Sequence, residues 1–112
     1  MSLRQTPQRR ERWVAMVMTQ QYLAGELSLL LAQLQAVTTG QERGAEVMRL
    51  RREAETLPVV ALRCVAARAL NLGEALCWDS VTRGDTAAFC RQAAVSAQLY
   101  EFGVCAGLLE KR

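Results

Sequence analysis

The stretch TRGDT, residues 82–86, decides the fold because it ends one helix and begins the next. Arg83 places a positive charge in the last turn of a helix, and Gly84 supplies the left-handed residue that closes it. Asp85 then caps the following helix, since its carboxylate accepts hydrogen bonds from free backbone amides. The Arg-Gly-Asp tripeptide is an adhesion ligand in some exported proteins, but here each of its residues has a structural role. We therefore predict a helical hairpin that turns at Gly84.

The residues on either side of this turn predict two long antiparallel helices, at about 58–83 and 86–109. Pro58 suits the first turn of the earlier helix. Asp79 lies four residues before Arg83, a spacing that predicts an ion pair between them. The apolar faces that should meet are formed by Leu62, Val65, Ala69, Leu72 and Leu76 and by Phe89, Ala93, Val95, Leu99, Tyr100 and Phe102.

The first half of the chain predicts one long and one short helix. Thr6 and Pro7 read as the N-cap and first residue of a helix that runs to about Val37 and stops at residues 38–40. A shorter helix covers residues 41–56 and ends at Leu57-Pro58. We predict an all-α, four-helix bundle-like domain with a flexible N-terminal arm (1–6), a single helical domain (7–109) and a polar tail (110–112).

The short helix is predicted to be a solvated lid on the bundle. It has one narrow apolar stripe, formed by Val47, Leu50, Ala54 and Leu57. On its other faces Arg49 and Glu53, and likewise Arg51 and Glu55, are spaced four residues apart as ion pairs.

The long helix carries the most information about function. A bundle seam in alternating steps of three and four contains Trp13, Met16, Gln20, Leu23, Leu27, Leu30, Leu34 and Val37. The opposite stripe is small and uncharged, which predicts a helix covered on more than one side: Gln21, Gly25, Ser28, Ala32 and Gln35. The helix is also longer than the hairpin behind it can cover. We predict a partner-binding surface formed by Trp13, Met16, Val17, Gln20, Leu23 and Leu27; the alternative is that this end folds onto its own core.

The composition favours helices and argues against a membrane span. Apolar residues make up 51% of the chain and charged residues 22%, with Gly 7, Pro 2 and no Ile. The weakly charged stretch from Trp13 to Gln41 is interrupted by four glutamines, so it is too polar to cross a bilayer. No secretory signal is evident, and we expect a cytoplasmic protein.

Enzymatic chemistry has little support in this sequence. There is no His, which excludes Ser-His-Asp and Cys-His catalysis and removes the commonest metal ligand. No glycine-rich phosphate-binding motif occurs. We therefore expect no enzyme activity, no metal and no cofactor.

The four cysteines, Cys64, Cys77, Cys90 and Cys105, form no CxxC motif. In a hairpin that turns at Gly84, Cys77 and Cys90 fall at one level, so a single disulfide between them is one interpretation. Buried, reduced thiols are the other interpretation, which suits an intracellular helical protein.

Charged residues suggest a second function class. Arg9, Arg10, Arg12, Arg49 and Arg52 are candidate phosphate contacts, although no aromatic residues for base stacking accompany them. Glu26 lies between apolar neighbours and should pair with an arginine from another helix, such as Arg63 or Arg91. We expect an association module, either a homo-oligomer or an adaptor or chaperone-like subunit, with an accessory subunit of a nucleoprotein assembly as the alternative.

Overall fold

The computed structural model describes the backbone of residues 2–56 and 58–112, and the side chains of residues 19–56, 58 and 60–112. The described residues form four helices and no strand, so the all-α prediction is confirmed. The helices are α1 (Ser2–Ala36), α2 (Gln41–Thr56), α3 (Val59–Arg83) and α4 (Thr86–Cys105).

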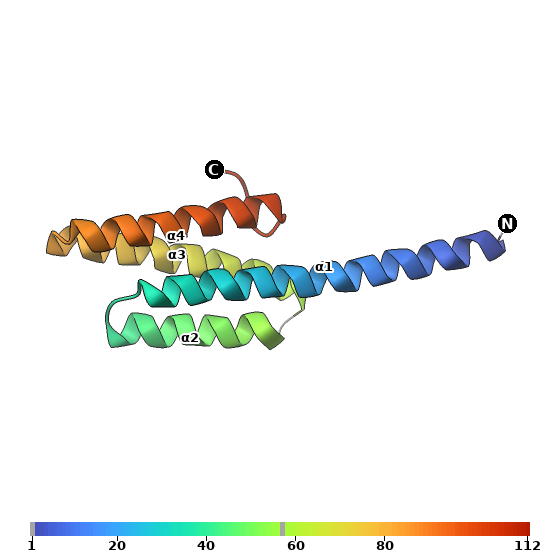
Figure 1. Ribbon diagram of the computed structural model, residues 1–112, viewed down its shortest axis with the longest axis horizontal. Helices are drawn as coiled ribbons and strands as arrows, with labels where there is room; N and C mark the ends of the chain where they lie inside the picture. The colour runs from blue at the N-terminus through green and yellow to red at the C-terminus, as the bar shows by residue number, and fades with distance from the viewer. Residues whose placement is uncertain (1, 57) are drawn as a thin grey trace.

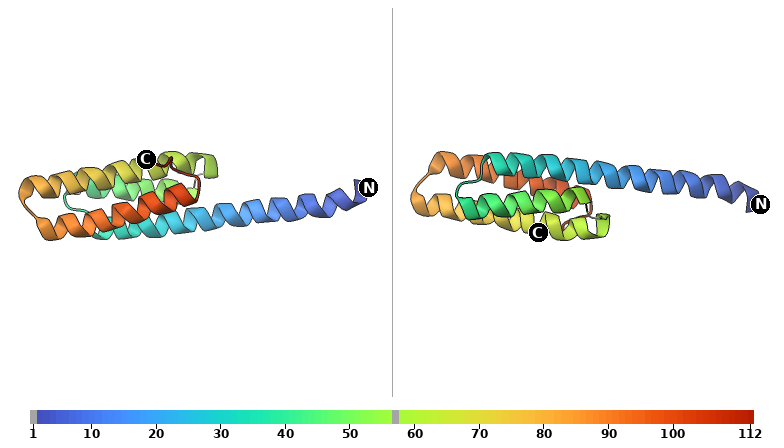
Figure 2. Two further views of the ribbon diagram at one scale, coloured as in Figure 1. Left: turned by 90° about the horizontal axis from the view of Figure 1, so that it is seen from above. Right: turned by 90° about the horizontal axis from the view of Figure 1, so that it is seen from below.

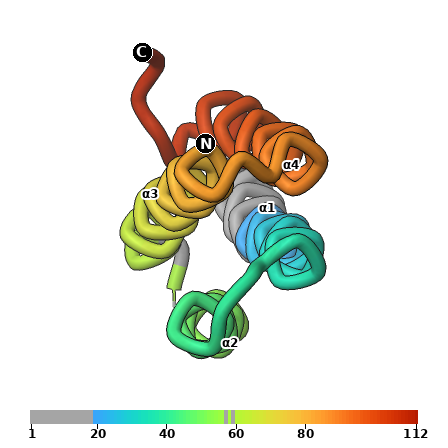
Figure 3. The backbone as a smooth tube through the Cα atoms, turned by 90° about the vertical axis from the view of Figure 1, so that its left-hand side faces the viewer, coloured from blue at the N-terminus to red at the C-terminus, as the bar shows by residue number. Residues whose placement is uncertain are grey.

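The helices pack side by side as an elongated bundle with extents of 66 × 26 × 17 Å. Consecutive helices run antiparallel (Figure 1). Viewed from the end, α1 lies beside both α2 and α4, and α3 lies beside α2 and α4 (Figure 3). α1 is the longest helix, with 35 residues against 25 in α3, and it continues past the others toward the N-terminus (Figures 1 and 2).

The turn between α3 and α4 forms as the sequence predicts. Gly84 has a positive φ of 73°, and its N–H donates to the Val81 carbonyl at 3.0 Å. The Asp85 N–H donates to the Ser80 carbonyl at 2.9 Å, and the Asp85 carboxylate accepts from the Ala88 N–H at 3.1 Å. These bonds satisfy the free carbonyls of α3 and a free amide of α4, which is why the chain reverses here.

Two helix ends differ from the prediction. α1 begins at Ser2 rather than near Pro7, so residues 2–6 are helical where the sequence predicts a flexible arm; their Leu, Arg and Gln have high helix propensity. α4 ends at Cys105 rather than near Leu109. Gly107 adopts a φ of 74°, and the Leu108 N–H returns to the Gly103 carbonyl at 2.7 Å. This early stop turns Leu108 into the core, where it is 5% exposed.

The core is built from leucine, valine and alanine. The predicted stripe of α3 is fully buried, and so are Val47, Leu50 and Ala54 of α2; Leu57 lies outside the described residues. Phe89, Ala93, Tyr100 and Phe102 of α4 are only half-buried. The central side chains come from all four helices: Leu27, Leu31, Leu34, Val47, Leu50, Leu62, Val65, Leu76 and Leu99.

A close approach between α3 and α4 depends on Gly73. A Cβ atom at this position would lie 2.3 Å from the Ser96 hydroxyl oxygen and 3.3 Å from its Cβ. A side chain at position 73 would therefore require the Ser96 hydroxyl to rotate away, and it would still press closely on the Ser96 Cβ.

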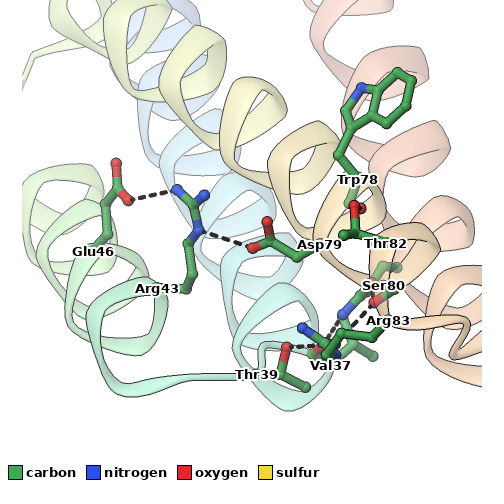
Figure 4. Close-up of polar contacts among 10 residues, drawn as sticks. Val37, Thr39, Arg43, Glu46, Trp78, Asp79, Ser80, Thr82 and Arg83 are labelled. Carbon is green, nitrogen blue, oxygen red and sulfur yellow. Dashed lines mark hydrogen bonds and ion pairs between the residues drawn. The ribbon is translucent and has the colours of Figure 1, made fainter.

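A buried polar chain connects three segments at one end of the bundle. The Ser80 hydroxyl donates to the Gln92 side-chain oxygen at 2.6 Å, and the Gln92 amide donates to the Val37 carbonyl at 3.0 Å. Both side chains are 0% exposed. The Arg83 guanidinium donates to Ser80 and to Thr39 at 3.3 Å each (Figure 4). Hydrogen bonds from Arg83 of α3 and Gln92 of α4 therefore hold the loop after α1 in place.

The predicted ion pairs along single helices do not form, and the arginines and acids involved bond to other helices; among the described residues, the one pair within a helix is Arg43 with Glu46 of α2, at 3.9 Å. Asp79 pairs with Arg43 at 3.3 Å, not with Arg83 (Figure 4). Glu53 pairs with Arg68 at 2.6 Å, not with Arg49. The predicted pair between Arg51 and Glu55 is also wrong, because Arg51 donates to Gln35 of α1. In each case an acceptor on a neighbouring helix lies within reach of the long arginine side chain.

Within the described part of the chain, no helix is both long enough and apolar enough to cross a membrane.

Candidate association surface

The solvent-facing side of α1 is a candidate contact surface. Between residues 19 and 36, every exposed residue of α1 is uncharged. Tyr22 is 63% exposed and Leu29 is 60% exposed. We define the outer α1 face by the residues that follow one another in steps of three and four along this side: Tyr22, Gly25, Leu29, Ala32 and Ala36.

The other helices carry charges where they face solvent, so the outer α1 face is unusual within this protein. Exposed charged side chains on α2, α3 and α4 include Glu42, Arg49, Arg52, Glu55, Arg63, Arg68, Arg91 and Glu101. Contiguous exposed apolar surface commonly marks a site of interaction with another protein.

α2 covers one edge of this face but not its centre. Arg51 and Met48 of α2 both bond to the Gln35 side chain, with 3.0 Å from the Gln35 nitrogen to the Met48 sulfur. Ser28, Ala32 and Gln35 are accordingly half-buried. Gln21 and Gly25 are exposed, so the prediction that the whole stripe is covered is wrong at these two positions.

Gly25 lies in the middle of α1 without a packing reason inside the chain. A Cβ atom built at this position meets nothing within 4 Å. Glycine inside a helix costs about 0.5–1 kcal/mol relative to alanine. This cost has no compensation among the described contacts, and a residue without a side chain permits another backbone to come close.

The predicted partner-binding residues divide into three groups. The side chains of Trp13, Met16 and Val17 lie outside the described residues, and Gln20 is half-buried. Leu23 and Leu27 are 8% and 0% exposed, and both belong to the core. The chain's own helices therefore cover these two leucines in this structure.

A second apolar feature is a groove of about 520 Å³ between α3 and α4. Trp78 and Val81 of α3 are 71% and 52% exposed at its edge, and Phe89 lines it from α4. The Trp78 indole points away from the polar contacts around Ser80 (Figure 4). This groove is bordered by two charged residues, Glu74 and Arg112, which bond to each other.

The cysteines are all free, so the Cys77–Cys90 disulfide is not formed. Cys64, Cys90 and Cys105 are exposed and Cys77 is half-buried. The expectation that the thiols are buried is therefore wrong for three of them. These three lie on the outward sides of α3 and α4, away from the leucine-rich interior.

We predict that Cys77 reacts with alkylating agents more slowly than the other three cysteines. Burial raises the pKa of its thiol, so less of the reactive thiolate is present at a given pH. A time course of iodoacetamide labelling at pH 8, followed by peptide mass spectrometry, would measure the four rates separately. Equal rates in the folded protein would contradict this prediction, and equal rates in denaturant are the control.

Glu26 does not make the predicted buried ion pair. It is half-buried, and its carboxylate forms no ion pair or hydrogen bond among the described residues. Arg63 and Arg91, the expected partners, are exposed. Glu26 is instead the only charged side chain of α1 between residues 19 and 36.

The candidate phosphate-binding arginines are only partly described. Arg49 and Arg52 are exposed on α2, and neither takes part in an ion pair within the described part of the chain. The side chains of Arg9, Arg10 and Arg12 lie outside it.

No protein-family model matches the chain, and no curated protein or solved structure matches it significantly. Among the residues searched, no three His, Cys, Asp or Glu side chains gather in a way that would hold a metal ion. The function of this chain therefore has to be inferred from the chain's own surface.

Proposed function

We propose that this chain is a non-enzymatic protein–protein association module whose contact surface is the outer α1 face. One observation carries the proposal: a solvent-facing helix presents no exposed charge between residues 19 and 36 but exposes most of Tyr22 and Leu29. Charged residues are depleted, and aromatic residues enriched, at the centres of protein interfaces.

The shape of the bundle also supports this proposal. α2, α3 and α4 pack around the side of α1 that carries Leu23, Leu27 and Leu34, so the opposite side is free for a partner. Tyr22 supplies a large rigid side chain, which is typical of residues that contribute most of the binding energy. Gly25, one helical turn away, lets that partner approach the helix closely.

The proposal assigns the chain no catalytic role. The chain contains no His, and burial raises the pKa of the Cys77 thiol, which makes it less reactive rather than more.

We predict that Leu29→Glu weakens association at least about tenfold while the fold is retained. The leucine is already largely exposed, so glutamate costs little in the free chain but would bury an unpaired charge in the complex. Val60→Glu is the matched control, because Val60 is 80% exposed on α3, away from the outer α1 face. Light scattering on a sizing column and capture of partners from the native host would compare both variants with the wild type.

Equal loss of association in the two variants would contradict the proposal, and so would no loss in either. Association should also survive high salt, because the centre of the surface is apolar.

A second candidate function is phosphate contact by the arginines. The exposed Arg49 and Arg52, which have no acidic partner among the described residues, favour it. Binding of single-stranded DNA would then fall steeply with salt, and Arg49→Gln with Arg52→Gln would reduce that slope. Binding that is absent at low salt would remove this candidate.

A further inference from the structure

We propose that the outer α1 face binds the same face of a second copy of this chain, with the two α1 helices antiparallel. This inference rests on the proposed association function and identifies its partner. It depends on the spacing, the sizes and the charges of the residues on this face.

The spacing of the face matches that of paired helices. Positions 22, 25, 29, 32 and 36 follow one another in steps of three and four, which places two residues per heptad along one line. All five residues are apolar or glycine. These five residues themselves bring no charge into such a pairing, and the half-buried Glu26 lies at its edge, beside Tyr22 and Leu29.

The sizes of these residues select an antiparallel alignment. When two copies cross near residue 27 in opposite directions, Leu29 lies opposite Gly25 of the partner subunit, and Tyr22 lies opposite Ala32 of the partner subunit. Each large side chain thus meets a small one, which permits the axes to come within about 8–10 Å. In the sequence, the same spacing continues to Met18, which falls opposite Ala36.

A parallel alignment would lack this match. Tyr22 would meet Tyr22 of the partner subunit and Gly25 would meet Gly25 of the partner subunit, so crowded and empty layers would alternate. Gly25, which nothing inside the chain requires, acquires a role as the site that receives Leu29.

Charge complementarity supports a second copy as the partner. Before residue 13 the sequence of α1 contains four arginines and one glutamate. In an antiparallel pair, this N-terminal part of one α1 lies next to one end of the partner's bundle. That end is where the partner's own α1 stops and its α2 begins. That end of the bundle carries four carboxylates against three guanidinium groups: Glu42, Glu46, Asp79 and Asp85 against Arg43, Arg83 and Arg91.

The paired faces account for about half of the area of a small specific interface. In this register residues 18–36 of one α1 lie along residues 18–36 of the other, an overlap of about 28 Å. At a helix width of about 10 Å this overlap covers about 560 Å² in total, whereas specific interfaces begin near 1,000 Å².

The first test is the solution mass of Gly25→Leu. The wild type should have twice the chain mass of 12.4 kDa, and the variant should dimerise at least about tenfold more weakly, because the added side chain clashes with Leu29 of the partner subunit. Its thermal midpoint under monomeric conditions should be unchanged or higher, since leucine favours helices more than glycine. The loss of dimer cannot then be attributed to misfolding.

Two variants complete this test. Gly44→Leu is the matched control, because a Cβ at Gly44 of α2 also meets nothing within 4 Å, and it should leave the dimer intact. Gly25→Leu combined with Leu29→Gly exchanges the large and small positions, and it should restore dimerisation.

The orientation is measured with a spin label at Ala36→Cys, after the four native cysteines have been replaced by Ala or Ser. In the antiparallel dimer the two labelled backbones are separated by about 18 residues of helix, or about 27 Å. In a parallel dimer they lie side by side. A long distance supports the inference.

The other outcomes separate the inference from the proposed function. A dimer that is lost in Leu29→Glu but gives a short label distance would overturn the antiparallel arrangement and leave the contact surface in place. A monomeric wild type that captures a different protein through Leu29 would overturn the second copy as partner and support the function. A dimer unaffected by both Leu29→Glu and Gly25→Leu would overturn both.

Discussion

Replacing Leu27 with alanine should lower the free energy of unfolding by about 2–5 kcal/mol. Leu27 is 0% exposed and packs in the core among leucines of the other helices, so the truncated side chain would leave a cavity. Urea denaturation followed by circular dichroism would measure the loss. A change this large would lower the melting temperature by roughly 10–30 °C for a chain of this size.

The matched control is Leu29→Ala on the same helix, measured below the concentration at which the chain associates. Leu29 is 60% exposed, so this variant should change the stability by no more than about 0.5 kcal/mol. Similar effects at both positions would mean that α1 does not present Leu27 inward. The pair therefore tests which side of α1 is the core.

Gln92→Leu should cost about 2–4 kcal/mol of unfolding free energy. The substitution keeps an apolar stem in the site but removes both the acceptor for the Ser80 hydroxyl and the donor to the Val37 carbonyl. A buried polar group left without a partner costs roughly 1–3 kcal/mol. Denaturation by urea is again the measurement, and Gln98→Leu on the exposed side of α4 is the control.

A double variant shows whether the cost arises from the unpaired hydroxyl. Ser80→Ala removes the group that Gln92→Leu leaves unsatisfied, so the two substitutions together should cost less than the sum of their separate effects. Strict additivity would contradict the hydrogen-bonded chain described here.

Local signals in the sequence were sufficient for most helix boundaries. Gly84 and Asp85 act through bonds to residues within five positions along the chain, and Pro58 precedes α3 as its N-cap. The end of α4 was missed although Gly107 was visible in the sequence. A helix can stop at any of several nearby residues, and here burial of Leu108 selects the earlier one.

Polar partners were predicted less well, because the sequence shows only neighbours on the same helix. Asp79 and Glu53 each have an arginine four residues away, yet both pair with arginines from other helices, Arg43 and Arg68. Whether Asp79 can reach Arg43, and Glu53 can reach Arg68, depends on how α2 and α3 pack. The Ser80–Gln92 bond was not predicted for the same reason.

The sequence by itself determined that this protein is all-helical, where α2 and α3 begin and end, and where α3 reverses into α4. It also contained two apolar lines along α1 with the same spacing, one through Leu23, Leu27, Leu30 and Leu34 and one through Tyr22, Leu29 and their small neighbours. Only the tertiary structure decided which line is inside. α2, α3 and α4 cover the leucine line, since it buries more apolar surface, and they leave Tyr22 and Leu29 facing solvent.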